Sequence, residues 1–332
     1  MPRLFALRRI AAILAAPFFA LPTAALGQHQ PGQQLFDFHN SMWINLHHFL
    51  YVTARSRLGL DLGRPAATSA ARDTAGMAAL PADERAMWDE AVGYYERQIA
   101  KRDILFDSGL VALNNRLSDL DDSESPRAAL RDSALAEVLE RAAPVYRAVW
   151  WPRHRAANAH WIATAMPLLA AFGDSAAAIE TRVVREPWSR TPIRVDVTAY
   201  ANWAGAYTTT DPAHITIAST DPAGAGQYEF ETLFHEVLHT MDDSLSAAAC
   251  AAFRSVRKRC PHDPTHPFIF YTAGDVTRRF FPGHVPYAEA NGLWSRVPDF
   301  AHALPLLRRY WQPYLDGRTS LSEALLEIAT AW

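Results

Sequence analysis

The sequence predicts an α+β protein that is predominantly α-helical, with a small β-sheet next to one distinctive helix. Two observations support this prediction. Apolar residues recur at three- and four-residue spacing along most of the chain, and a period-two alternation occurs only in a short stretch near residues 193–200. Helices come first, the strands follow, and helices return to the C-terminus, so we expect N- and C-terminal helices to flank the sheet.

A short basic stretch opens the chain, and an apolar run interrupted by two prolines follows it over residues 10–26. Ala25 and Gly27 are small residues at the positions that precede signal-peptide cleavage. We therefore expect residues 1–27 to be a signal peptide that is removed before Gln28. The mature chain is then secreted or periplasmic and has no stable membrane span.

Composition and charge favour a globular protein that does not bind nucleic acid. The formal net charge of −3 gives no electrostatic basis for binding nucleic acid or an anionic membrane surface. The two cysteines, Cys250 and Cys260, lie close together in a chain that we expect to be exported. A local disulfide is therefore favoured over two free thiols.

Helical periodicity dominates residues 28–190, which we expect to form an N-terminal helical region. The stretch 61–82 is rich in Ala, Gly, Thr and Pro and is expected to be a loop. The candidate helices of this region cover residues 36–57, 83–108, 127–148, 155–171 and 174–185.

Residues 191–332 are expected to form a second, catalytic region that begins with two strands. Apolar and polar residues alternate from Ile193 to Tyr200, as in a half-buried strand. A second short strand is expected at residues 214–220. The aromatic and small-residue stretch between them, residues 202–212, is expected to be a loop.

The stretch 228–243 is typical of an amphipathic helix with two separate faces. Its apolar stripe consists of Phe230, Leu233, Phe234, Val237, Leu238 and Met241. A second stripe on roughly the opposite side consists of Glu231, His235, His239 and Asp242. Two histidines four residues apart lie on successive turns and can offer imidazole nitrogens to one metal ion. Glu236, directly after the first histidine, points sideways toward a water at that ion.

The sequence HEVLH at residues 235–239, with the strand 214–220 before it, resembles the HExxH motif of the zincin metallopeptidases. The resemblance implies a zinc ion held by His235 and His239. It also implies that Glu236 acts as the general base that activates a water for peptide-bond hydrolysis. In that superfamily the strand before the motif helix commonly forms the edge of the cleft and pairs with an extended peptide substrate.

Two subfamily patterns of the zincins are absent from this chain. The metzincin extension needs a Gly and a third His or Asp at positions where this chain has Asp242 and Leu245. The close gluzincin spacing also fails, because no acidic residue occurs between Ser244 and His262. The resemblance is therefore gluzincin-like with an atypical spacing of the third ligand, and it identifies no specific family.

The third zinc ligand has four candidates, which are Asp263, His266, Asp275 and Glu289. We favour Asp275, because a carboxylate in a strongly apolar helix needs a compensating partner. An ion pair with Arg279, four residues further on, explains the same carboxylate equally well. Glu289 is the next choice and His266 follows it.

Zinc peptidases commonly add a hydrogen-bond donor that stabilises the oxyanion of the tetrahedral intermediate. The candidates for this donor are Tyr207, Tyr271, Tyr287 and His266, and the sequence does not choose among them. For His39, His47 and His48, near the predicted first helix, packing or capping is favoured over a place in the cleft wall.

The leading hypothesis is a zinc-dependent metallopeptidase that acts on a peptide or protein substrate. One alternative is a catalytically weak zincin-fold protein of the cell envelope that binds zinc and serves as a scaffold. Another is a zinc hydrolase that acts on a non-peptide amide. The peptidase hypothesis requires Glu236 for hydrolysis, whereas the scaffold hypothesis does not. A peptidase that pairs its substrate with an edge strand should prefer substrates with several residues on each side of the cleaved bond, whereas a hydrolase of small amides should not.

Overall fold

The computed structural model describes residues 34–60, residue 73 and residues 76–332. Within them the protein is predominantly helical and contains one small mixed sheet, which confirms the predicted fold class. The predicted signal peptide, residues 1–27, and most of the predicted loop 61–82 lie outside the described residues.

The first group of helices packs around an aromatic core. It comprises α1 (Met42–Arg57), α3 (Ala82–Gln98), α4 (Ser108–Ser118), α5 (Ser133–Val149) and the short 3-10 helices Gly76–Ala79 and Pro126–Ala128. Phe49 of α1 lies at the centre of this core, within 6 Å of the rings of Trp88, Trp150 and Tyr200. Burial of such large aromatic side chains stabilises this part of the chain.

The long helix α6 (Trp151–Val184) links this group to the rest of the molecule. We predicted two helices here, with a break near Gly173, but the helix is continuous. Gly173 packs closely in this helix, because a Cβ atom there would lie 3.0 Å from Cδ1 of Leu35. Among the described helices, α6 is the one that is long and apolar enough to cross a membrane by length and composition alone.

The sheet contains four strands in the order β1-β2-β4-β3. Its strands are β1 (Phe36–His39), β2 (Ile193–Thr198), β3 (Ala206–Thr210) and β4 (Ala213–Ala218). β1 pairs with β2 and β2 with β4 in parallel, whereas β3 pairs with β4 in the antiparallel direction. The sheet is therefore built from chain segments on both sides of the long helix.

Helices fill the remainder of the chain after the sheet. A 3-10 turn (Pro222–Gly224) leads to α7 (Gln227–Leu238), which carries the motif. The others are α8 (Asp243–Ser255), α9 (His266–Phe280), α10 (Tyr287–Ala290), α11 (Leu293–Arg296), α12 (Pro298–Leu306), a π-helical turn (Leu307–Trp311), α13 (Gln312–Leu315) and α14 (Leu321–Ala331).

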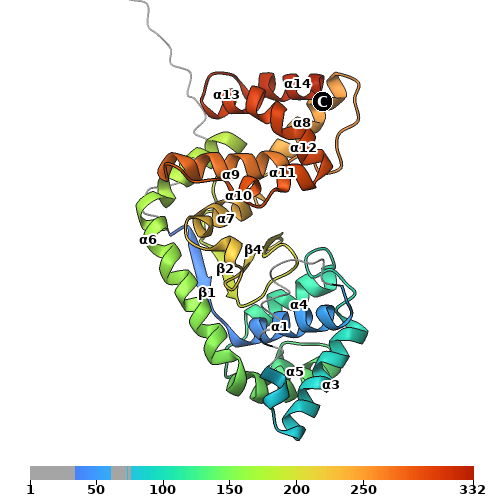
Figure 1. Ribbon diagram of the computed structural model, residues 1–332. Helices are drawn as coiled ribbons and strands as arrows, with labels where there is room; N and C mark the ends of the chain where they lie inside the picture. Colours follow the sequence, from blue (N-terminus) through green and yellow to red (C-terminus); the bar gives the residue numbers. More distant parts are fainter. Residues whose placement is uncertain (1–33, 61–72, 74–75) are drawn as a thin grey trace, which may run out of the picture.

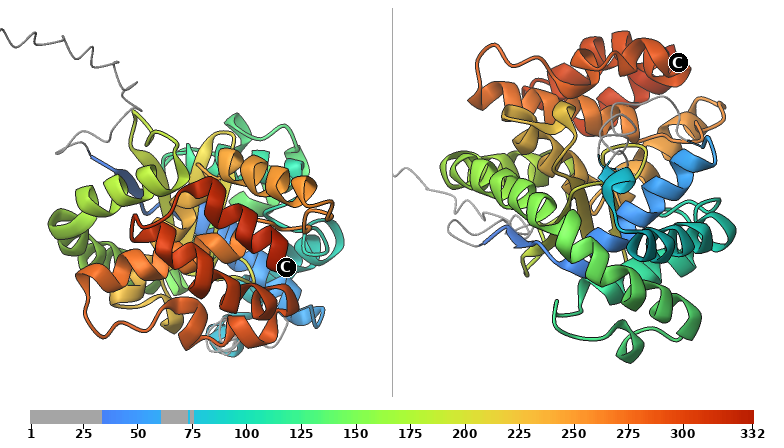
Figure 2. Two further views of the ribbon diagram at one scale, coloured as in Figure 1. Left: turned by 90° about the horizontal axis from the view of Figure 1, so that it is seen from above. Right: turned by 60° about the horizontal axis from the view of Figure 1, so that its bottom comes forward.

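The sheet separates two hydrophobic cores. One core lies among α1, α3, α4 and α5, and the other joins the strands to α7, α9, the C-terminal helices and the second half of α6. In Figure 1, α1, α3, α4 and α5 lie on one side of the sheet, α7 and α9 lie on the other, and α6 runs along the flank. The views in Figure 2 show the same arrangement, with the light green α6 extending from one group to the other.

Several predicted elements differ from those observed. The predicted helix 36–57 begins with strand β1, because Phe36 and Phe38 pair with β2 before α1 starts. The predicted helix 83–108 ends at Gln98, and α4 was not predicted. The predicted loop 202–212 contains strand β3, whose run of threonines favours extended backbone. Tertiary pairing outweighs the local helical pattern at β1, and the small and aromatic residues before the threonines suggested a loop at β3.

Candidate metal centre

Three histidines converge at one point between α7 and α9. His235, His239 and His266 each offer one ligand nitrogen, and these nitrogens all lie within 4.8 Å of one another. His235 is buried, and the other two are half-buried. Three imidazoles at this spacing can hold one metal ion and leave a fourth position open, as in catalytic zinc sites.

The apolar stripe of α7 fixes the direction in which its histidines point. Phe230, Phe234 and Val237 are fully buried and belong to the second core, where α7 packs against α6 and α9. The predicted amphipathic helix is therefore present, although it ends at Leu238. His239 follows as the C-cap and keeps helical backbone angles, so it remains one turn from His235.

His266 is the first residue of α9, and several contacts hold it there. Asp263 accepts a hydrogen bond from the main-chain N–H of His266 at 3.1 Å, and its second oxygen lies 3.1 Å from Nδ1 of the ring. That contact leaves Nε2 as the nitrogen available to an ion. Thr265 donates to Asp242 at 2.8 Å and so ties the start of α9 to the end of the motif segment.

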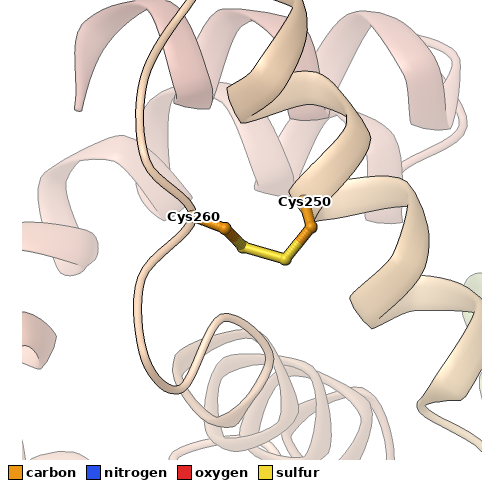
Figure 3. The surroundings of a disulfide bond; sticks show 2 residues. All are labelled: Cys250 and Cys260. Atoms are coloured by element: carbon orange, nitrogen blue, oxygen red, sulfur yellow. A yellow bond between two sulfur atoms is a disulfide. The ribbon is translucent and has the colours of Figure 1, made fainter.

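A disulfide lies just before this segment. Cys250 of α8 and Cys260 are bridged, which confirms the predicted pairing. Figure 3 shows the bridge joining the helix to the extended segment that leads to His266. The chain between α8 and α9 is thus fixed at one end by the bridge and at the other by Asp263 and Thr265.

The environment of the cluster favours neutral imidazoles. Burial, with the neighbouring histidines, lowers the pKa of His235 well below its usual value. Burial and the proximity of His266 lower the pKa of His239 to about 4. Nδ1 of His235 is buried and has no hydrogen-bond partner among the described residues. Neutral imidazoles with unsatisfied nitrogens are what a metal ion requires of its ligands, so these residues fit a bound ion.

Glu236, the predicted general base, directly follows His235 on α7. It is buried, and Oγ1 of Thr208 lies 2.6 Å from its carboxylate Oε2. Burial raises the pKa of Glu236 to about 7, with the Thr208 hydrogen bond acting in the opposite direction. A carboxyl group with a pKa near neutrality can both take up and release a proton at physiological pH.

The structure does not bring Asp275, the favoured third ligand, to the histidine cluster. Its carboxylate lies toward the other end of α9, 2.7 Å from Nη2 of Arg279 and 3.1 Å from Nε2 of Gln312. The ion pair with Arg279 therefore accounts for this buried carboxylate, and the group that could hold a metal ion contains His266 and not Asp275. Glu289, the second choice, is exposed on α10 and is not part of the cluster.

Two of the candidate oxyanion donors have hydroxyl groups engaged elsewhere. The hydroxyl of Tyr207 lies 2.8 Å from Nε2 of His48 and accepts from Asn114 at 2.9 Å. Tyr271 donates to Gln312 at 2.8 Å. His266 belongs to the group that could hold a metal ion, and the ring of Tyr287 stacks on Phe270 beside that group.

An aromatic layer borders the cluster on the α9 side. The ring of Phe270 lies 4.0 Å from that of His235 and 4.9 Å from that of His266, measured between centroids. Tyr287 stacks on Phe270 at 6.3 Å, and Phe300 meets His266 edge-on at 5.7 Å. Such a layer limits water around the imidazoles and strengthens electrostatic interactions within the site.

The edge of the sheet nearest the motif helix is β3 and not the predicted strand. The sequence indicated residues 214–220, but β4 lies between β2 and β3, so both of its sides are paired. β3 is the end strand and contacts α7. Thr208, which reaches Glu236 from this strand, was missed because its segment was interpreted as a loop. The run of β-branched threonines in AYTTT was the available signal.

Comparison of the chain with protein-family models, with curated proteins and with solved structures gives no match. Any functional assignment therefore rests on the geometry of the site itself.

Proposed function

We propose that this protein is an exported zinc-dependent metallopeptidase of the zincin type. One observation carries the proposal: the three imidazoles of His235, His239 and His266 converge on one point next to the buried carboxylate of Glu236. This is the ligand number of a catalytic zinc site with its fourth position open, and it is accompanied by a base.

Zinc, when bound, would supply Lewis-acid chemistry that polarises a carbonyl group and makes a water more acidic. His235, His239 and His266 would hold it as neutral ligands. Glu236 would accept the proton of the attacking water and deliver it to the leaving amine, which suits its pKa of about 7. Tyr287, which stacks on Phe270 beside His235, is the proposed donor to the developing oxyanion.

Two further features support a peptide substrate outside the cytosol. Among the described residues, β3 is paired on one side only, so an extended peptide can add to its other side as a further strand. The Cys250–Cys260 disulfide agrees with an oxidising compartment and with removal of residues 1–27 as a signal peptide. We infer peptide or protein substrates on this basis.

The first experiment measures metal content and hydrolysis in the mature chain. We expect about one zinc per chain by inductively coupled plasma mass spectrometry. We also expect cleavage within a mixture of internally quenched peptides. Glu236→Gln should retain zinc and lower kcat by at least roughly 10³-fold, because the proton acceptor is lost while the ligands remain.

The outcomes separate the competing hypotheses. Zinc binding without any hydrolysis above that of Glu236→Gln would favour the scaffold protein of the cell envelope. Hydrolysis that does not improve with residues on either side of the cleaved bond would favour a small amide substrate. A chain that binds no metal would contradict all three hypotheses.

A further inference from the structure

We propose that Thr208 is a positioning residue that holds the general base Glu236 from the edge strand β3, and that the same residue presents its main chain to the substrate. This inference rests on the proposed function. Thr208 lies on β3, whereas the motif lies on α7.

The side chain of Thr208 is committed to Glu236. Its hydroxyl lies 2.6 Å from Oε2 and 3.0 Å from the main-chain oxygen of Glu236, and the residue is 9% exposed. A hydroxyl donor at 2.6 Å to a buried carboxylate selects one orientation of that carboxylate. Thr208 therefore fixes the orientation of the Glu236 carboxylate before substrate binds. Such preorganisation favours efficient proton transfer.

The main-chain N–H and C=O of Thr208 point away from β4, its neighbouring strand. Ala218 N–H donates to Gly205 of the β3 segment at 2.8 Å, and Ser219 N–H donates to Thr198 of the β2 segment at 2.8 Å. Successive residues of β4 thus alternate between their two neighbouring strands. Ile215, the partner of Thr208, belongs to the set that faces β2, so the N–H and C=O of Thr208 face away from β4.

The opposite face of β3 is fixed to the N-terminal helices. Tyr207, next to Thr208, is buried, and its hydroxyl is held by His48 of α1 and Asn114 of α4. Successive side chains of a strand point to opposite faces, so these contacts fix the strand without occupying the Glu236 side. β3 thereby places Thr208 relative to α7.

The two roles of Thr208 predict different kinetic consequences. Removal of the hydroxyl leaves the main-chain groups in place, so substrate binding should be retained while proton transfer becomes less efficient. We expect Thr208→Val, which has the same shape, to lower kcat by roughly 10- to 100-fold. KM should stay within about twofold, because the main-chain groups that would bind the substrate are unchanged.

The experiment compares Thr208→Val with Thr208→Ser and Thr209→Val, assayed on a quenched peptide that the wild-type protein cleaves. Thr208→Ser restores the donor and should recover most of kcat. Thr209→Val removes a neighbouring hydroxyl on the other face of β3, whose nearest acceptor is 3.5 Å away, and serves as the matched control. Equal kcat in Thr208→Val and wild type would overturn the proposal. So would a loss of kcat accompanied by a loss of zinc and a lower Tm, because the role would then be structural.

A second measurement does not depend on activity. Crystal structures of wild type, Thr208→Ser and Thr208→Val should show the Glu236 carboxylate in one place in the first two, and displaced or in several rotamers in the third. An unmoved carboxylate in Thr208→Val would overturn the inference. If the wild type cleaves no peptide, the proposed function fails, and this structural comparison still decides whether Thr208 positions Glu236.

Discussion

The carboxylate of Asp263 holds His266 at the candidate metal centre. Asp263 contacts both the main-chain N–H and the ring Nδ1 of His266, so one side chain sets the position of the helix start and the orientation of the ring. Histidine ligands commonly donate their second nitrogen to such a carboxylate, which fixes the tautomer. His266 begins α9 and lies in the histidine group, whereas Asp275 lies further along the helix and pairs with Arg279.

Replacement of these two residues gives opposite expected results. His266→Ala removes one of three ligands and should weaken zinc binding by more than roughly 100-fold. Asp275→Asn should leave zinc affinity unchanged and lower the free energy of unfolding by about 1–3 kcal/mol, since the ion pair with Arg279 is lost. Competition titration with a chromogenic chelator measures the affinity, and urea unfolding measures the stability. Loss of zinc from Asp275→Asn would return that residue to the ligand set.

The motif residues could be predicted from sequence, whereas the position of His266 beside them could not. His235 and Glu236 lie on α7 and His239 is its C-cap with helical backbone angles, so the helical period alone sets their relative positions. His266 reaches the cluster through the packing of α9 against α7, a contact between elements that no local pattern encodes. Thr208 depends in the same way on how a strand packs against a helix.

At the scale of elements, the segment between α8 and α9 positions His266 at the candidate metal centre. The bridge between Cys250 and Cys260 closes a loop with a sequence separation of 10 residues. In the chain-entropy account, a loop of that size stabilises the folded state by about 2–3 kcal/mol. The bridge also restricts the position of the chain segment that leads to Asp263 and His266.

Removal of the bridge should therefore affect both stability and metal binding. We expect the double variant Cys250→Ser and Cys260→Ser to lose about 2–3 kcal/mol of unfolding free energy, in line with the entropy lost on closing the loop. Zinc affinity should fall as well, because the position of His266 becomes less restricted. Thermal unfolding with and without added zinc tests this. Unchanged affinity would show that Asp263 and Thr265 suffice to hold the start of α9.

Element types were predicted better than their limits. The uninterrupted helical pattern of α7 gave a correct helix, and the alternation from Ile193 gave a correct strand. The break expected at Gly173 did not occur, because that glycine accommodates the close approach of Leu35 within a continuous helix. β1 could not be predicted, since four residues become a strand only when β2 pairs with them.

At the scale of the molecule, a buried polar layer joins the N-terminal helices to the sheet. Asp196 of β2 lies 2.7 Å from Nε of Arg194 and 2.5 Å from Nε2 of His214, and Asn115 of α4 contacts the other nitrogen of His214 at 3.0 Å. Burial by itself would raise the pKa of Asp196. The hydrogen bonds from His214 and Arg194 outweigh it and lower that pKa to about 2.

This layer predicts an acid-dependent stability. A carboxyl group whose pKa is lower in the folded than in the unfolded state stabilises fully above its unfolded pKa, about 3.9, and loses this contribution as the pH falls toward 2. Asp196→Asn should lower the unfolding free energy at pH 7 by about 2–3 kcal/mol. The difference from wild type should shrink between pH 4 and pH 2. Urea unfolding across this range measures it, and a constant difference would show that the charge of Asp196 is not the cause.

Under the proposed function, the disulfide would make metal binding depend on cellular location. A chain in a reducing cytosol would lack the bridge, so the segment that leads to His266 would be less restricted, while His235 and His239 lie at a packed helix. In that state two imidazoles would be in place and the third would be held less firmly. Oxidation after export would then do more than strengthen the fold, because it would complete the zinc site only where the proposed hydrolysis cannot damage cytosolic proteins.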